Sequence, residues 1–275
     1  MHQLSADPAP QACAVAQPLI EARGLIKEYV RHNGVTRVVD DVSFTVQPGE
    51  TLGLVGESGC GKTTVARILL RLIEPTAGEV LFEGAPVPPA SSHQMRSLRR
   101  RMQIVFQDPY AALNPRMTVQ QILAEPFTIH REPPAEGLTS RLADLLLSVG
   151  LDASVLPRYP HQFSGGQRQR INIARALALR PRFLVLDEPV SSLDVSVGAQ
   201  IVNLLRHLQR TLGLTYLFIS HSMPLVRYLC DRIAVMQCGR LVEIGECIQV
   251  CESPRSPYTR QLIAATPKLP DPSIR

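Results

Sequence analysis

The sequence has 275 residues, of which 45% are hydrophobic and 19% are charged, and its formal net charge is +5. This composition is too apolar for intrinsic disorder, and the length excludes a small scaffold stapled by metals or disulfides. The longest stretch without Asp, Glu, Lys or Arg is Thr211 to Val226, which has 16 residues. A bilayer-spanning helix needs about 20 apolar residues, so we expect none in this chain.

The charge composition argues against a nucleic-acid-binding protein, and the cysteine spacing argues against a metal site built from CxxC pairs. Only three of the 29 basic residues are Lys, there is no Trp, and aromatic residues make up 5%. A nucleic-acid surface combines cations with stacking rings, so no nucleic-acid partner is expected. The six cysteines contain no CxxC pair and are expected to be reduced thiols. The amino end lacks the basic region of a secretory signal, which favours a cytosolic protein.

The first half of the chain predicts alternating strands and helices after a loose tail at 1–17. Val65, Ile68 and Leu69 begin an apolar face with helical spacing that continues through Leu72 and Ile73. Strands are predicted at 38–46, 50–55, 79–82 and 103–106, and a basic helix at 95–101.

Residues 108–178 change character, because they contain helical patterns joined by Pro-containing loops and no β-rich run. The expected helices of this insertion are 118–125, 139–149 and 165–178. Strands and helices then alternate again, at 183–186, 197–211, 215–220, 224–230, 232–236 and 241–244. Such alternation predicts an α/β fold with a mostly parallel sheet covered by helices on both faces.

A glycine-rich motif lies between a predicted strand and the first predicted helix. It fits G-x-x-x-x-G-K-[ST] with the residues Gly56, Glu57, Ser58, Gly59, Cys60, Gly61, Lys62 and Thr63. Its backbone amides and the following helix N-terminus suit phosphate groups, Lys62 supplies a mobile charge, and the Thr63 hydroxyl can bind Mg²⁺. Because Lys is so scarce, the chance of an accidental match is about one in a thousand.

Two further motifs fit the same chemistry. The apolar strand 183–186 ends in Asp187 and Glu188, which can hold Mg²⁺ and polarise an attacking water. Ser164, Gly165, Gly166 and Gln167 open a predicted helix, where Ser is a good N-cap and the glycine amides can bind an anion. Alone, each has a structural explanation, as an acidic turn after a strand or as an ordinary capped helix.

The order of these motifs resembles the nucleotide-binding subunit of ABC transporters. It comprises GESGCGKTT, Gln107, SGGQ, LVLDEP, SSLD and His221 after a strand, over about residues 18–268. The segments FQDPY, LNPRMT, HQFSGGQRQR and SPYT resemble the ATPases of dipeptide, oligopeptide and nickel importers. The resemblance implies a P-loop core (18–107 and 179–250) with an N-terminal antiparallel β region, a helical subdomain with the signature motif (108–178), and a C-terminal extension (251–275).

The resemblance also implies roles for individual residues. Thr63, Gln107 and Asp187 would hold Mg²⁺, and Gln107 would also contact the attacking water. Thr64 would join the loop 56–63 in binding ATP. Glu188 would be the general base, or at least the group that orients the water. His221 would contact the γ-phosphate, although a lone His is otherwise more often structural. Tyr29 would stack on adenine, unless it merely covers a sheet edge.

Dimerisation is implied because Ser164 to Gln167 would act in trans on ATP held by a second ABC ATPase subunit, identical or different. Asp194 would bridge the two subunits. Two ATP molecules would join the cassettes, and the motion would pass through the loop 108–117 to membrane permease subunits. These permease subunits would be served by an extracytoplasmic solute-binding protein. The resemblance also implies that this chain lies peripherally at the cytoplasmic face of the inner membrane. Alternatives are the ATP-binding partner of a phosphonate-lyase complex and a non-transport cassette ATPase.

One hypothesis concerns the thiol of the glycine-rich loop. Cys60 lies two residues from Lys62 and beside a helix N-terminus, surroundings expected to favour a reactive thiolate. The alternative is a small side chain tolerated in the loop.

Overall fold

The computed structural model describes residues 17–31 and 34–265, so the predicted tail falls outside it except for Gln17, as does the segment 266–275 of the C-terminal extension. A six-stranded sheet forms the centre, in the order β10-β9-β3-β8-β7-β6. All neighbours pair in parallel except β9 and β10, which pair antiparallel. The strands are β3 (Thr51–Val55), β6 (Met102–Val105), β7 (Phe183–Asp187), β8 (Thr215–Ile219), β9 (Arg232–Gln237) and β10 (Arg240–Glu246).

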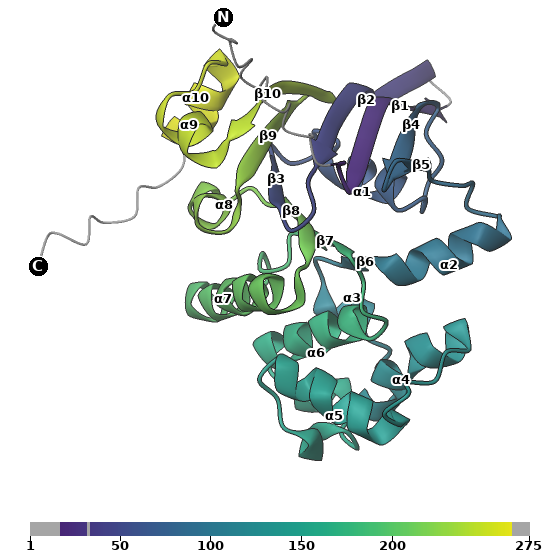
Figure 1. Cartoon of the computed structure of the whole chain (residues 1–275). Coiled ribbons are helices and arrows are strands. Elements are labelled where there is room, and N and C mark those ends of the chain that lie inside the picture. The colour runs from purple at the N-terminus through teal and green to yellow at the C-terminus, as the bar shows by residue number, and fades with distance from the viewer. Residues whose placement is uncertain (1–16, 32–33, 266–275) are drawn as a thin grey trace, which may run out of the picture.

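A second, antiparallel sheet of four strands lies beside this core (Figure 1). Its order is β2-β1-β4-β5, with β1 (Ile20–Arg31), β2 (Gly34–Val46), β4 (Ala77–Phe82) and β5 (Ala85–Pro86). Strand β1 was not predicted, because register shifts between Ala22 and Glu28 interrupt the alternation of apolar and polar residues that marks a strand.

The core helices are α1 (Lys62–Leu69), α2 (His93–Arg101), α7 (Val195–Leu212) and α8 (Met223–Leu229). The predicted face of the first helix ran on to Ile73, but α1 ends at Leu69 because Arg71 adopts a left-handed conformation (φ 49°). Two C-terminal helices, α9 (Cys247–Glu252) and α10 (Pro257–Ala264), were not predicted as helices. α9 has only six residues, and in α10 the polar run Thr259, Arg260 and Gln261 interrupts the apolar positions.

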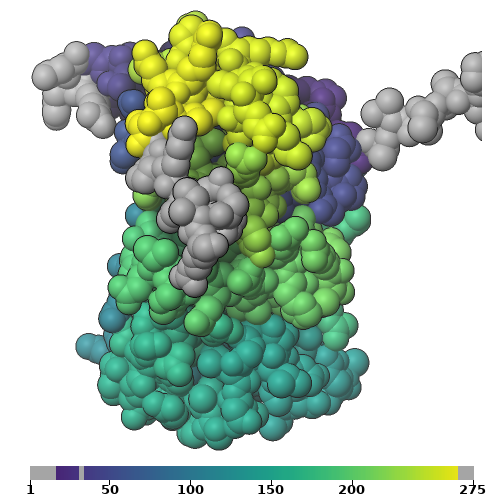
Figure 2. All heavy atoms as spheres, turned by 90° about the vertical axis from the view of Figure 1, so that its left-hand side faces the viewer, coloured from purple at the N-terminus to yellow at the C-terminus, as the bar shows by residue number. Residues whose placement is uncertain are grey.

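The helical region between β6 and β7 lies at one end of the molecule and α9 and α10 at the other (Figures 1 and 2). It contains α3 (Pro109–Ala112), α4 (Val119–His130), α5 (Leu138–Ser148), two short 3₁₀ turns (Ala153–Val155 and Pro160–Gln162) and α6 (Gly165–Leu177). Among the described residues, no helix is both long enough and apolar enough to cross a membrane.

The parallel sheet is buried on both faces, and each face belongs to a different hydrophobic cluster. In β7, Phe183 and Val185 pack into the cluster with α1 and the antiparallel sheet, whereas Leu184 and Leu186 pack with α6, α7 and α8. Burying a side chain of this size contributes about 1.5–3 kcal/mol. Continuous apolar strands such as 183–186 are therefore typical of this position, and the predicted mostly parallel α/β sheet is confirmed.

Candidate functional site

The glycine-rich loop 56–63 connects the buried strand β3 to α1, and neighbouring backbone crowds it from behind. Gly56 has φ 152°, and a Cβ atom there would lie 2.1 Å from the carbonyl oxygen of Met236. Only glycine fits so close an approach. The sequence thus brings the loop tightly against the end of β9 and leaves its other side, with exposed Glu57, Ser58 and Gly59, open to solvent.

Lys62 begins α1 and is only 5% exposed. Its Nζ atom donates hydrogen bonds to the carbonyl oxygens of Gly56 (2.8 Å) and Glu57 (2.7 Å), so the ammonium folds back over the loop. A buried ammonium requires such partners, and phosphate oxygens can take their place. The first amides of α1 have no intrahelical partner and favour an anion at this end of the helix.

Thr63 faces the end of β7, where its Oγ1 atom donates a hydrogen bond to Oδ1 of Asp187 (3.1 Å). Burial raises the pKa of Asp187, and the Thr63 hydroxyl opposes that shift only in part. A buried carboxylate beside a hydroxyl is a pair of hard oxygen donors, which suits Mg²⁺ completed by phosphate oxygens and water. The residues present therefore fit this cation.

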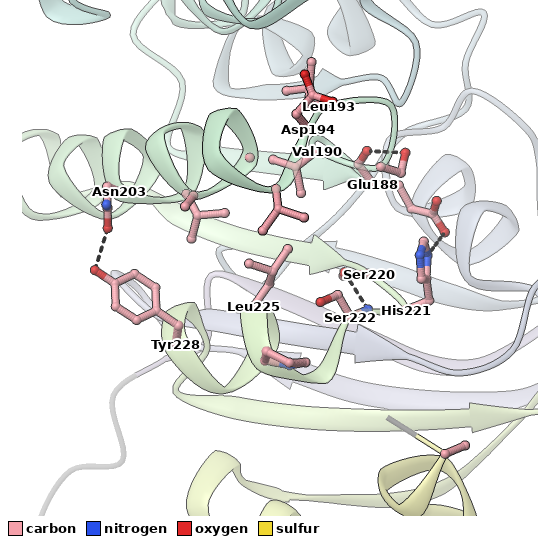
Figure 3. Close-up of a pocket in the computed structure, with 17 residues that line it drawn as sticks. Glu188, Val190, Leu193, Asp194, Asn203, Ser220, His221, Ser222, Leu225 and Tyr228 are labelled. Carbon is pink, nitrogen blue, oxygen red and sulfur yellow. Dashed lines mark hydrogen bonds and ion pairs between the residues drawn. The ribbon is translucent and has the colours of Figure 1, made fainter. Parts of the chain in front are cut away.

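Glu188 lies at the centre of a second cluster, formed where three neighbouring parallel strands end. Its Oε2 atom accepts a hydrogen bond from Nε2 of Gln107 (3.0 Å), and its Oε1 atom lies 3.3 Å from Nδ1 of His221. Gln107 follows β6, Glu188 follows β7 and His221 follows β8, so the parallel register brings them to one edge of the sheet. Figure 3 shows Glu188 and His221 next to each other there.

The backbone at Glu188 is left-handed, with φ 47°, which is uncommon for a residue with a side chain. Its N–H donates a hydrogen bond to the carbonyl oxygen of Ile219 (3.0 Å) on β8. Such conformations cost about 1–3 kcal/mol and persist where the surroundings hold them, often at functional sites. Here the hydrogen bond to β8 helps to hold the carboxylate between Gln107 and His221.

The SGGQ segment forms a complete capping box at the start of α6. The Ser164 hydroxyl accepts the N–H of Gln167 (3.3 Å), and the Gln167 side chain accepts the N–H of Ser164 (3.1 Å). A Cβ atom at Gly166 would lie 2.4 Å from Cγ1 of Val197, so glycine allows α6 to pack on the first turn of α7. Gly165 also packs there, beside Leu193. Ser164 itself is exposed, and its partner lies within its own helix.

The remaining predicted residues lie around these clusters. Asp194 is exposed at the N-cap of α7 and lines a cavity of about 900 Å³ together with Glu188 and His221 (Figure 3). Tyr29 is exposed on β1, with Nζ of Lys27 5.2 Å from the centre of its ring. Thr64 is half-buried on α1, one residue beyond the Thr63 hydroxyl that reaches Asp187.

The prediction for the Cys60 thiol is wrong. Cys60 is buried, and burial raises the pKa of its thiol, although Lys62 opposes the shift from 3.7 Å. The desolvation penalty on the thiolate exceeds the attraction of a lysine whose charge is already shared by two carbonyl oxygens. The resting thiol is therefore neutral at pH 7.

Two residues that hold the site in place were not predicted. Gln169 on α6 is fully buried, and its Nε2 atom donates to the carbonyl oxygen of Pro189 (2.7 Å), the residue after Glu188. Tyr258 on α10 accepts a hydrogen bond from the N–H of Glu57 (3.1 Å). No sequence signal links these pairs, because each depends on how separate elements pack.

Comparisons with known proteins agree with this geometry. The sequence profile of the ABC transporter family matches residues 39–191. The chain is 52% identical to a putative peptide import ATP-binding protein of Brucella ovis, over 94% of this chain and 81% of that protein. It is 51% identical to the oligopeptide transport ATP-binding protein OppF of Bacillus subtilis, over 94% of this chain and 85% of that protein.

A solved structure shows the same architecture. It is a dimeric ATP-binding cassette in a post-hydrolysis state bound to ADP and Pi, and it superposes with a TM-score of 0.74 at 27% identity. The match covers 83% of this chain and 98% of that one.

Proposed function

Because the chain belongs to the ABC transporter family and is an ATPase of that family, we propose that it powers an importer for peptides. The names of its relatives, peptide import and oligopeptide transport ATP-binding proteins, support peptides as the substrate class. The observation that carries the hydrolytic role is the joining of Gln107, Glu188 and His221 beside the Thr63–Asp187 pair.

In the proposed reaction, the loop 56–63 binds the phosphates of ATP and Lys62 neutralises their charge. Thr63, Asp187 and Gln107 would hold Mg²⁺, which would supply charge neutralisation at the phosphate oxygens. Glu188 orients and deprotonates the attacking water, and its hydrogen bonds to Gln107 and His221 hold the carboxylate in place. His221 is exposed next to this carboxylate, where it can reach the γ-phosphate.

The proposed active unit is a dimer of cassettes, with Ser164 to Gln167 of each subunit closing on ATP in the other. Ser164 caps its own helix but is exposed to solvent, so it is accessible to a nucleotide held by another subunit, which supports this role in trans. Asp194 and Tyr29 are also exposed, which suits contacts to a second subunit and to adenine respectively.

Coupling to membrane permease subunits is proposed to run through the loop 108–117. Tyr110 in this loop is 65% exposed. The Arg168 guanidinium stacks on the Tyr110 ring, with its Cζ atom 3.8 Å from the ring centre. Arg168 lies near the start of α6, directly after the signature segment 164–167. A displacement of Tyr110 can therefore be transmitted through Arg168 to that segment. The protein is proposed to sit at the cytoplasmic face of the inner membrane, held there by the permeases.

Peptide uptake in the host tests this function. Deleting the gene should abolish uptake of a radiolabelled tripeptide, and the wild-type gene should restore it, whereas Glu188→Gln should not. The growth rate on free amino acids serves as the control. Undiminished uptake of di-, tri- and pentapeptides in the deletion strain would rule out peptides as the substrate class.

A further inference from the structure

The C-terminal extension contacts the glycine-rich loop through one tyrosine. Tyr258 lies in the first turn of α10, is 8% exposed, and accepts the N–H of Glu57 at 3.1 Å across 201 residues of sequence. In the sequence, the SPYT segment indicates only a family resemblance. The hydrogen bond gives this segment a physical connection to the loop expected to bind ATP.

Glu57 is held from both sides of its backbone. Its N–H is bound by Tyr258, and its carbonyl oxygen accepts the Nζ atom of Lys62 (2.7 Å). A further contact from the C-terminal half reaches the same loop, because the N–H of Gly239 donates to the carbonyl oxygen of Cys60 (3.1 Å). The turn between β9 and β10 and the first turn of α10 thus both fasten the loop.

Tyr258 is itself held in position by the anchoring of α10. The carboxylate of Glu243 on β10 accepts the N–H groups of Arg255 (2.8 Å) and Ser256 (3.0 Å), immediately before the helix. Burial opposes ionisation of Glu243, but these amides, together with the Thr259 side chain and the Arg255 charge, outweigh it and keep the pKa of its carboxyl below the usual value. The start of α10 is therefore fixed to the sheet that supports the loop.

We propose that Tyr258 is a positioning residue of the ATP site, which holds the Gly56–Glu57 peptide in the orientation that binds nucleotide. A glycine-rich loop samples many conformations. Each hydrogen bond that restrains the loop reduces the fraction of molecules whose loop cannot bind nucleotide. When only a fraction of the molecules is competent, the apparent dissociation constant rises by the inverse of that fraction. The inference rests on the proposed role of 56–63 as the phosphate-binding loop.

Tyr258→Phe tests the proposal, because it keeps the ring and removes only the acceptor. We expect KM for ATP, and the dissociation constant of a fluorescent ATP analogue, to rise about three- to tenfold, which corresponds to the loss of one part-buried hydrogen bond. The kcat at saturating ATP should stay within about twofold, because nucleotide binding then restores the loop.

Tyr216→Phe is the matched control. The Tyr216 hydroxyl donates to the carbonyl oxygen of Leu205 (3.1 Å) in the core, so the variant loses a buried hydrogen bond that does not touch the loop. It should lower the melting temperature without changing KM for ATP. A folded Tyr258→Phe variant with the wild-type KM would overturn the proposal.

Two carboxylate variants keep the test decisive if Tyr258→Phe does not fold. Glu243→Gln loosens the anchor of α10 and should raise KM for ATP, whereas Glu252→Gln, which breaks only the exposed pair with Arg227, should not. Equal KM values for both would contradict the proposal.

Lys62→Ala distinguishes a failure of the proposed phosphate-binding role of the loop from a failure of the proposed role of Tyr258. Retained binding of the ATP analogue by this variant would contradict the assignment of the loop. Lost binding there, together with wild-type binding by Tyr258→Phe, would contradict only the role of Tyr258.

Discussion

Glu188 shows how much a single residue depends on its neighbours. Its carboxylate accepts a hydrogen bond from Gln107 and approaches His221, while its left-handed backbone is held by a hydrogen bond to Ile219. The residue type was foreseeable from the Asp-Glu pair after an apolar strand. The two partners lie 81 and 33 residues away in the sequence, so a motif search without the family pattern would have found neither.

We predict that Glu188→Gln binds ATP but hydrolyses it about 10²- to 10⁴-fold more slowly. The amide keeps the shape of the side chain and can still accept the Gln107 hydrogen bond, but it cannot accept a proton from water. Phosphate release and binding of a fluorescent ATP analogue measure the two properties separately, and wild-type turnover would refute the role as general base.

Cys60 should react slowly with iodoacetamide at pH 7, because burial raises the pKa of its thiol and leaves little thiolate. Below that pKa the thiolate fraction rises about tenfold per pH unit, so alkylation should accelerate steeply as the pH increases from 7 to 9. Peptide mapping by mass spectrometry follows the reaction, with exposed Cys238 as the internal control. Rapid alkylation of Cys60 at pH 6.5 would contradict the burial argument.

At the scale of elements, α6 connects three parts of the site. Its N-terminus presents the capping box, Gly166 packs on Val197 of α7, and Gln169 bonds to the carbonyl oxygen of Pro189 next to Glu188. Only the capping box was readable from the sequence, because its members lie three residues apart. The contacts of Gly166 and Gln169 depend on where α7 and β7 end in space.

Gly166→Ala should destabilise the protein by about 1–3 kcal/mol, because the new methyl group would overlap Val197. Val197→Ala removes the overlapping atoms, so the double variant should recover most of the lost stability and ATPase activity. Thermal unfolding and ATP hydrolysis measure this recovery. No recovery in the double variant would show that Gly166 matters for another reason, such as contact with nucleotide.

Tyr110→Ala should reduce peptide uptake more than the basal ATPase activity of the purified chain. Tyr110 stacks with Arg168, whereas the Glu188 carboxylate has Gln107 and His221 as its partners. Leu147→Ala, an exposed apolar position on α5, is the control and should change neither property. A proportional fall of uptake and ATPase activity in Tyr110→Ala would assign the loop to catalysis or folding.

For the whole molecule, the two proposed halves of the ATP site lie in separate regions. Lys62 bonds to the carbonyl oxygens of its own loop, and Ser164 bonds to its own helix. In the described part of the chain, the hydrogen bonds of Lys62 and Ser164 therefore do not link the phosphate loop to the signature segment. We propose that a second subunit brings its signature segment, residues 164–167, opposite the phosphate loop.

Mixing two inactive variants tests this division, if the chain pairs with itself. Lys62→Ala and Ser164→Arg should each be inactive, but their heterodimer has one intact site, so the mixture should regain about a quarter of the wild-type activity. Gel filtration with ATP in the Glu188→Gln background shows whether dimers form. Dimers without recovered activity would contradict sites shared between subunits.

The sequence by itself determined the α/β fold, the phosphate-loop pattern, the acidic end of β7 and the capped signature helix. Each of these depends on residues close together in the chain, where periodicity and turn chemistry act. Only the tertiary structure decided that burial keeps the Cys60 thiol neutral, that bulged β1 is a strand, and that Tyr258 reaches Glu57. These features depend on contacts between elements, because desolvation, strand pairing and the meeting of α10 with the loop arise only when the chain packs.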